Sequence, residues 1–287
     1  MGQAIPVFLI SLARAAERRK AATRHLRHIG AEFELIEGVD GSALSKEELV
    51  RVVAPGVELP LGHIGCYMSH IRTYEQFLKT GKPHGLVVED DARPDPRFVR
   101  VLQRGIENAD WDYCYLNCDW MNSDGQVFYD AGSPFIINET FRAYRLSGGP
   151  WGCYSYMITR EAARRRLEHA FPIAHEIDVY SKYPYPVRFR AIVGPKGSWL
   201  NEQHYQSYVT GWSKPMEQLP FARLRRSKLF VAARDALRFH GVRGWMKARQ
   251  LVRQGKLPPG AWRALPTEHV LFGYGAASPA ADAAAGP

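Results

Sequence analysis

The sequence predicts an α/β protein: a Rossmann-type mixed sheet flanked by helices, followed by a basic helical appendage at the C-terminal end. Three observations lead to this prediction. Apolar strand-like runs alternate with helix-like segments over residues 5–193, three adjacent carboxylates follow one such strand, and excess positive charge is confined to residues 214–287. Strands that alternate with helices are typical of sheets covered by helices on their faces.

The length and composition are those of a globular protein with a full-sized core. The chain has 287 residues, of which 46% are hydrophobic and 23% charged. It contains no apolar run of about 18 residues, and its start lacks the features of a secretory signal, so we expect a cytoplasmic protein. The cysteines do not form a C-x-x-C set and are expected to be reduced thiols in the core. The spacing of Cys114 and Cys118 is only a weak zinc signal.

The N-terminal segment predicts a strand, a helix and a second strand. Pro6–Ile10 is a short apolar run. Arg14–Ile29 carries apolar residues at helical spacing, and Gly30 is placed to end that helix. Phe33–Ile36 then predicts another strand. A β-α-β order of this kind predicts a parallel pair of strands with a right-handed crossover.

The middle of the chain predicts further helices and strands. A helix is expected over Cys66–Thr80, with Gly81 as its stop, and a helix capped by Thr159 is expected to run to about residue 169. Strands are expected at residues 86–88, 113–116, 153–158 and 187–193. Residues 119–150 are polar, rich in glycine and without clear periodicity, which favours a mobile loop or excursion over a core element.

The apolar strand Leu86–Val88 leads directly into Glu89, Asp90 and Asp91. Three adjacent acids repel one another unless a cation balances them. A solvated turn helped by nearby arginines is one interpretation. The other follows from position, because ligands bind at the carboxyl ends of strands in open α/β sheets. Carboxylates there could hold Mg²⁺ or Mn²⁺ together with substrate phosphates, and no P-loop or G-x-G-x-x-G is present to hold phosphates instead.

The net charge of +9 comes entirely from the C-terminal part of the chain. Residues 1–213 hold 25 basic and 25 acidic residues, whereas residues 214–287 hold 13 basic and 4 acidic ones. Residues 214–272 are expected to form basic amphipathic helices, and residues 273–287 a disordered tail. The helices could lie on an anionic membrane, bind nucleic acid, or pack on the preceding domain; membrane contact is favoured and nucleic acid least expected.

Five motifs, in order over about residues 5–210, resemble glycosyltransferase family 25, which includes lipooligosaccharide and collagen galactosyltransferases. They are "VFLISLARAAERR" (7–19), "EGVDG" (37–41), "LGHIGCYMSHIRTYEQ" (61–76), "LVVEDDA" (86–92) and "CYSYMITREAARRRL" (153–167), with Ile177-Asp178 after them. The G-C-x-x-S-H helix is the most specific piece. The opening departs from the family: Ser11-Leu12-Ala13-Arg14 stands where Asn-Leu-Asp/Glu-Arg is usual.

The resemblance implies a GT-A-like catalytic domain over residues 1–213. It also implies a UDP-galactose or UDP-glucose donor, a divalent metal, inversion at the anomeric carbon, and a hydroxyl acceptor on a lipid-linked or other glycan. Asp91, with Asp90 or Glu89 in support, would hold Mn²⁺ or Mg²⁺ and stabilise charge on the leaving diphosphate.

The resemblance also suggests roles for individual residues. Asp178 is the first choice for the base that activates the acceptor hydroxyl; a metal or acceptor contact, or a plain surface carboxylate, are the alternatives. The residues expected to bind the donor are Arg14, Asp40, Gly41, Ser69, His70, Glu89 and Asp90.

Purely structural roles for these residues stay open. Asp40 and Gly41 could form a turn beside a helix, His70 could be a satisfied core residue, and Arg14 could lie on a solvated helix face with Arg18 and Arg19. As a whole, the chain could instead be a non-catalytic, membrane-associated module that binds a sugar nucleotide.

Overall fold

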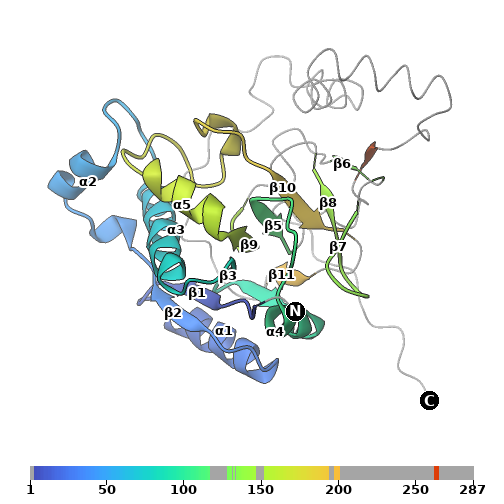
Figure 1. Ribbon diagram of the computed structural model, residues 1–287. Coiled ribbons are helices and arrows are strands. Elements are labelled where there is room, and N and C mark those ends of the chain that lie inside the picture. Colours follow the sequence, from blue (N-terminus) through green and yellow to red (C-terminus); the bar gives the residue numbers. More distant parts are fainter. Residues whose placement is uncertain are drawn as a thin grey trace, which may run out of the picture.

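The computed structural model centres on a mixed sheet. Within the part of the chain that it describes, the sheet has eight strands in the order β2-β1-β3-β9-β5-β10-β8-β7 (Figure 1). The described residues are 3–116, 128–130, 132, 134–146, 152–193, 197–200 and 262–264. The expected α/β fold class, with a Rossmann-type mixed sheet flanked by helices, is confirmed.

The N-terminal β-α-β unit forms as predicted. β1 (Val7–Ser11) pairs in parallel with β2 (Glu34–Glu37), and α1 (Ala16–His28) connects them. Gly30 follows the helix with a φ of 75°, a left-handed conformation that glycine adopts without strain. Because β1 and β2 are parallel, their carboxyl ends lie at the same edge of the sheet.

Two helices follow, and the second carries much of the candidate site. α2 (Lys46–Val52) was not predicted, although Ser45 and Glu48 form a capping box at its start, a signal readable in the sequence. α3 (Leu61–Lys79) covers the predicted helix but begins five residues earlier, directly after Pro60. Gly81 follows its end with a φ of 70°.

The centre of the sheet is where its mixed character arises. β3 (His84–Glu89) is parallel to β1 but antiparallel to β9 (Ser155–Thr159), which is also antiparallel to β5 (Tyr113–Tyr115). β10 (Phe189–Ile192) then pairs in parallel with β5. All four strands were predicted, and α5 (Arg160–Glu168) starts at the predicted Thr159 cap, whose hydroxyl accepts the Ala162 N–H.

The prediction that residues 119–150 lack core elements is wrong for residues 134–146. β7 (Phe135–Ile136) and β8 (Arg142–Arg145) extend the sheet beyond β10. Inward residues Phe141 and Ala143 are fully buried between exposed arginines, so the two strands are held by a few apolar contacts in a polar stretch. Strands this short show too little alternation to be recognised by period.

Smaller pairings complete the described structure. β4 (Ala92–Pro94) pairs with β11 (Ser198–Leu200), and β6 (Phe128–Asp130) pairs with β12 (Trp262–Ala264). Apart from β12, the expected basic segment 214–272 and the expected tail 273–287 lie outside the described residues. Among the described residues, no helix is long and apolar enough to cross a membrane.

Helices cover both faces of the sheet, and each face has its own apolar core (Figure 1). α3 and α5 pack on the face that presents Phe8 and Val87. α1 and the short helix α4 (Val99–Arg104) pack on the face that presents Leu9 and Val88. With both faces covered, the ends of the strands are left as the place where a ligand can reach the sheet.

Candidate active site

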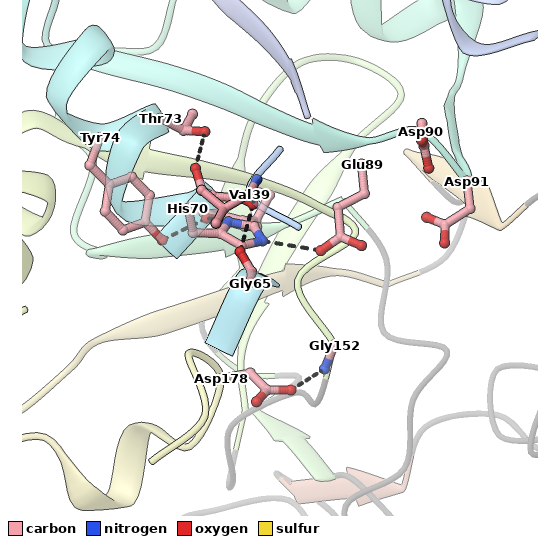
Figure 2. Close-up of polar contacts among 12 residues, drawn as sticks. Val39, Gly65, His70, Thr73, Tyr74, Glu89, Asp90, Asp91, Gly152 and Asp178 are labelled. Atoms are coloured by element: carbon pink, nitrogen blue, oxygen red, sulfur yellow. Dashed lines mark hydrogen bonds and ion pairs between the residues drawn. The ribbon is translucent and has the colours of Figure 1, made fainter. Parts of the chain in front are cut away.

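The three adjacent carboxylates lie at the carboxyl-terminal edge of the sheet, as predicted. Glu89 is the last residue of β3, and Asp90 and Asp91 form the turn that follows (Figure 2). They line a cavity of about 590 Å³ together with the end of β1, residues 38–42, the start of α3 and two arginines of the first helical segment. The cavity therefore gathers parts of four separate segments around the acidic turn.

Arg18 is the counter-ion of the acidic turn. Its guanidinium contacts the Asp90 carboxylate and donates to Asp91 Oδ2 at 2.8 Å. Ser11 Oγ donates to Asp90 Oδ2 at 2.6 Å, so Asp90 is held from two sides and is 3% exposed. Arg18 is itself buried on the inner face of α1.

Asp91 is the less satisfied of the two aspartates. Its Oδ1 is buried and has no hydrogen-bond partner within the described part of the chain. Burial and the neighbouring Glu89 carboxylate raise the pKa of Asp91 to about 7, although Arg18 acts in the opposite direction. An unpartnered carboxylate oxygen on a cavity wall, beside two more carboxylates, fits an oxygen-preferring cation such as Mn²⁺ or Mg²⁺.

Glu89 faces a hydrogen-bonded chain that runs into the core (Figure 2). His70 Nε2 lies 3.1 Å from Glu89 Oε1, and its Nδ1 lies 2.7 Å from the Tyr156 hydroxyl. The Tyr156 hydroxyl in turn lies 2.6 Å from that of Tyr74. His70 is 1% exposed and stacks on Tyr156, so it is a satisfied core histidine that also reaches the cavity. Its fixed ring orients Glu89.

Residues 39–41 pack closely against the start of α3. A Cβ on Gly41 would lie 1.8 Å from the Leu61 carbonyl oxygen, so only glycine fits there. Ser69 Oγ accepts the Val39 N–H at 2.8 Å and donates to the Gly65 carbonyl. The predicted residues Gly41 and Ser69 line the cavity, and their observed contacts hold its wall in shape.

Asp40 and Arg14 form the more open part of the cavity. Arg14 Nε donates to Asp40 Oδ2 at 2.9 Å, and 48% of the arginine side chain is exposed. Asp40 also accepts the N–H and hydroxyl of Ser42, which together with Arg14 lower its pKa although slight burial opposes them. Asp40 therefore stays ionised, and the half-exposed guanidinium of Arg14 can contact an anion that enters the cavity.

Asp178 lies outside the cavity lining, near enough to Cys66 on the cavity wall for its charge to help raise the pKa of that thiol. It belongs to the segment between α5 and the short helix at Tyr180–Lys182, and it does not line the cavity. Its Oδ2 accepts the Gly152 N–H at 2.7 Å, and burial raises its pKa although that hydrogen bond opposes the rise (Figure 2). A carboxyl with a raised pKa suits a general base, and its role stays a prediction.

The cysteines are free thiols, as expected, wherever the structure describes them. Cys114 and Cys153 are buried, Cys66 is half-buried on the cavity wall, and Cys118 lies outside the described residues. Burial raises the pKa of the Cys66 thiol well above its usual value. The sulfur of Cys66, an imidazole nitrogen of His70 and a carboxylate oxygen of Glu89 lie within 4.8 Å of one another, a grouping that sequence reasoning missed.

Arg18 and Ser11 were the other site residues missed from the sequence. A signal existed for Arg18, because it shares a helical stripe with Ala15, Ala22 and Leu26, all of them buried. A charged residue on an apolar stripe needs a buried partner. Ser11 offered no such signal, because its contact depends on the pairing of β1 with β3.

The helix-flanked sheet with an acidic cavity at the carboxyl ends of its strands places the chain in the Rossmann-type α/β class. Residues 4–181 match the model of a family described as "Glycosyltransferase family 25 (LPS biosynthesis protein)". That match covers more than half of the chain, so the chain belongs to glycosyltransferase family 25.

Some similar proteins are named for a transferase activity, and others are named as inactive members of the family. The chain is 25% identical over 228 residues to a "Glycosyltransferase 25 family member" of Aedes aegypti, covering 75% of this chain and 35% of that protein. It is 30% identical over 125 residues to human "Procollagen galactosyltransferase 2", covering 38% and 20%. A mouse relative, 27% identical over 176 residues and covering 56% and 28%, is named "Inactive glycosyltransferase 25 family member 3". The chain thus spans about a third or less of the length of these curated relatives.

Proposed function

We propose that the chain transfers galactose or glucose from a UDP-sugar to a hydroxyl of a lipopolysaccharide, lipooligosaccharide or other glycan, with inversion at the anomeric carbon. The observation that carries the proposal is the acidic turn, Glu89 to Asp91, which opens onto a cavity that also holds Arg14 and Arg18. Carboxylates and guanidinium groups on one wall suit a ligand that carries both a cation and a diphosphate.

Asp91 is the residue best placed to hold a divalent cation, with Asp90 in support. Its Oδ1 lacks a partner among the described residues, whereas both oxygens of Asp90 are engaged by Arg18 and Ser11. Mn²⁺ or Mg²⁺ at this place would supply positive charge where the leaving diphosphate becomes more negative. Arg14, being half exposed, would contact the same diphosphate from the open side of the cavity.

Asp178 is our proposed base for the acceptor hydroxyl. Burial raises the pKa of its carboxyl, which brings it closer to the range in which a base can take a proton near neutral pH. The Gly152 N–H fixes one oxygen of the carboxylate. Because Asp178 lies outside the cavity lining, the acceptor would approach from a different side than the donor.

The alternative is a non-catalytic module that binds a sugar nucleotide at the membrane. Two features favour it: several relatives are named inactive, and Ala13 replaces a polar residue in the usual opening of the family. The intact acidic turn with its unpartnered Asp91 oxygen favours the transferase. The two functions differ in whether the bound donor is cleaved.

The test is UDP release from UDP-galactose and UDP-glucose, with Mn²⁺ or with EDTA. We expect slow release that requires Mn²⁺ and disappears in Asp91→Asn. Asp95→Asn is a matched control, because Asp95 is a buried aspartate near the acidic turn that pairs with Arg97 and does not line the cavity. Metal-dependent UDP binding without release, with and without candidate glycan acceptors, would support the binding module, and neither binding nor release would contradict both functions.

We further propose that basic residues in segment 214–272 hold the protein on the cytoplasmic face of an anionic membrane, close to a lipid-linked acceptor. The support is the charge of residues 214–287, with 13 basic and 4 acidic residues. Deleting residues 214–287 should weaken co-sedimentation of the protein with anionic liposomes. Unchanged co-sedimentation would rule out this role for the segment.

A further inference from the structure

We propose that Cys66, His70 and Glu89 form a second cation site that binds a transition metal of the zinc class, separate from the oxygen ligands of Asp90 and Asp91. One sulfur, one nitrogen and one oxygen of these side chains lie within 4.8 Å of one another. Thiolate, imidazole and carboxylate are the three ligand types that Zn²⁺ uses in proteins. All three side chains line the described cavity, so a fourth position would be open to it.

Two rigid elements present the three ligands. Cys66 and His70 are four residues apart in α3, which places them on the same face of the helix. Glu89 comes from the last position of β3, a central strand of the sheet. The start of α3 is in turn held by its close approach to Gly41. Cys66 and Glu89 are half-buried, which leaves their side chains freer to adjust than the buried ring of His70.

His70 is supported in the manner typical of a metal-binding histidine. Such histidines use the second ring nitrogen for a hydrogen bond that fixes the ring. His70 Nδ1 lies 2.7 Å from the Tyr156 hydroxyl, which is itself bonded to Tyr74, while Nε2 is directed at Glu89 (Figure 2). On metal binding, Nε2 would be the ligand, Nδ1–H would donate to Tyr156, and the Cys66 thiol proton would pass to water as the sulfur–metal bond forms.

The chemistry of the two ligand sets predicts different metal preferences. Asp90 and Asp91 offer oxygen alone, which suits Mg²⁺ and Mn²⁺. The set of Cys66, His70 and Glu89 adds nitrogen and sulfur, which suit Zn²⁺ and Co²⁺ better than Mg²⁺ or Mn²⁺. Arg18 contacts the aspartates and is not part of the mixed set. A zinc-class ion bound by Cys66, His70 and Glu89 would also engage the Glu89 carboxylate, which leaves Asp90 and Asp91 as the oxygen ligands of the acidic turn.

The test is a titration of the full-length, metal-free protein with Co²⁺, read by optical absorption. We expect one equivalent to bind with a thiolate-to-cobalt charge-transfer band, which Zn²⁺ then abolishes by displacement. Cys66→Ala should remove the band and weaken binding about tenfold or more. Cys114→Ala is the matched control, because Cys114 is a free thiol in the opposite core, and it should leave the band unchanged.

Two further variants keep the result decisive. If Cys66→Ala does not fold, Glu89→Gln should weaken Co²⁺ binding while the thiolate band persists at higher metal concentration. Asp91→Asn should lose Mn²⁺-dependent UDP binding but keep the cobalt band, so failure of the proposed function and failure of this site give different results. No thiolate band in the wild type, a band that survives Cys66→Ala, or its loss in Asp91→Asn would each overturn the proposal of a separate site.

Discussion

Replacing Asp91 with asparagine should stabilise the metal-free protein while it removes a ligand of the proposed cation. Burial and the Glu89 carboxylate raise the pKa of Asp91 from 3.8 to about 7 in the folded protein, despite the contact with Arg18. Above that pH the folded protein holds a charged carboxylate in a poorly solvated place, whereas the unfolded chain exposes it to water. The free energy of unfolding therefore carries a penalty that is specific to this residue.

The sign and size of the penalty follow from the shift. Because the pKa is raised by folding, the folded state keeps a proton that the unfolded chain releases, and stability falls as the pH rises from about 4 to about 7. One pKa unit corresponds to about 1.36 kcal/mol, so a shift from 3.8 to about 7 lowers stability by about 4 kcal/mol at about pH 8. Asparagine resembles the protonated carboxyl at every pH. The variant should gain up to this amount at about pH 8 and less than half of it at about pH 5.

The assay is equilibrium unfolding in urea with EDTA, at about pH 5 and about pH 8, for the wild type and Asp91→Asn. Arg18 keeps its contact with Asp90 in the variant, so its charge stays paired. Asp95→Asn is the control and should destabilise, because the Asp95 carboxylate accepts bonds from the Arg97 backbone and side chain. Saturating Mn²⁺ should stabilise the wild type, by about 2.7 kcal/mol at a hundred times the dissociation constant, and leave Asp91→Asn nearly unchanged. An Asp91→Asn variant less stable than the wild type at about pH 8 would refute the reasoning, because the Arg18 contact would then outweigh burial.

Two other substitutions probe the wall of the cavity and the proposed base. Gly41→Ala should destabilise by several kcal/mol in urea unfolding, since its Cβ would lie 1.8 Å from the Leu61 carbonyl oxygen. Gly38→Ala, whose nearest contact would be 3.2 Å, should cost far less, and equal losses would contradict the packing argument. Asp178→Asn should lower kcat by about 10²–10⁴-fold while Mn²⁺-dependent UDP binding persists, and an unchanged kcat would exclude Asp178 as the base.

Local patterns were sufficient to predict the elements that deliver the acidic turn. Three consecutive apolar residues, Leu86–Val88, bracketed by turn signals predicted β3, and the β-α-β order of the first segment predicted the parallel pairing of β1 with β2. The place of Glu89 to Asp91 was predicted because ligands bind past the carboxyl ends of strands in open α/β sheets, and the parallel pairing of β3 with β1 puts the acids at that edge. The helix that carries His70 was predicted from its period, although its first residues were missed.

The contacts that could not be predicted from the sequence depend on strand register and on pairing between distant segments. Ser11 meets Asp90 because Ile10 is in register with Glu89, and no local pattern in either strand encodes that register. β8 joins the sheet only because β10 is there to pair with it.

Arg18 belongs to a third kind of contact, in which a local signal exists but its partner is distant. Its place on the apolar stripe of α1 indicates that the guanidinium is buried, and physical chemistry then requires an anion beside it. Asp90 lies 72 residues further along the chain, in the acidic turn. The three adjacent carboxylates of that turn likewise require a cation. Matching the buried cation to these acids would have indicated that α1 lies beside the end of β3. That step uses charge balance rather than periodicity, and it places Arg18 on the cavity wall beside the aspartates of the proposed cation site.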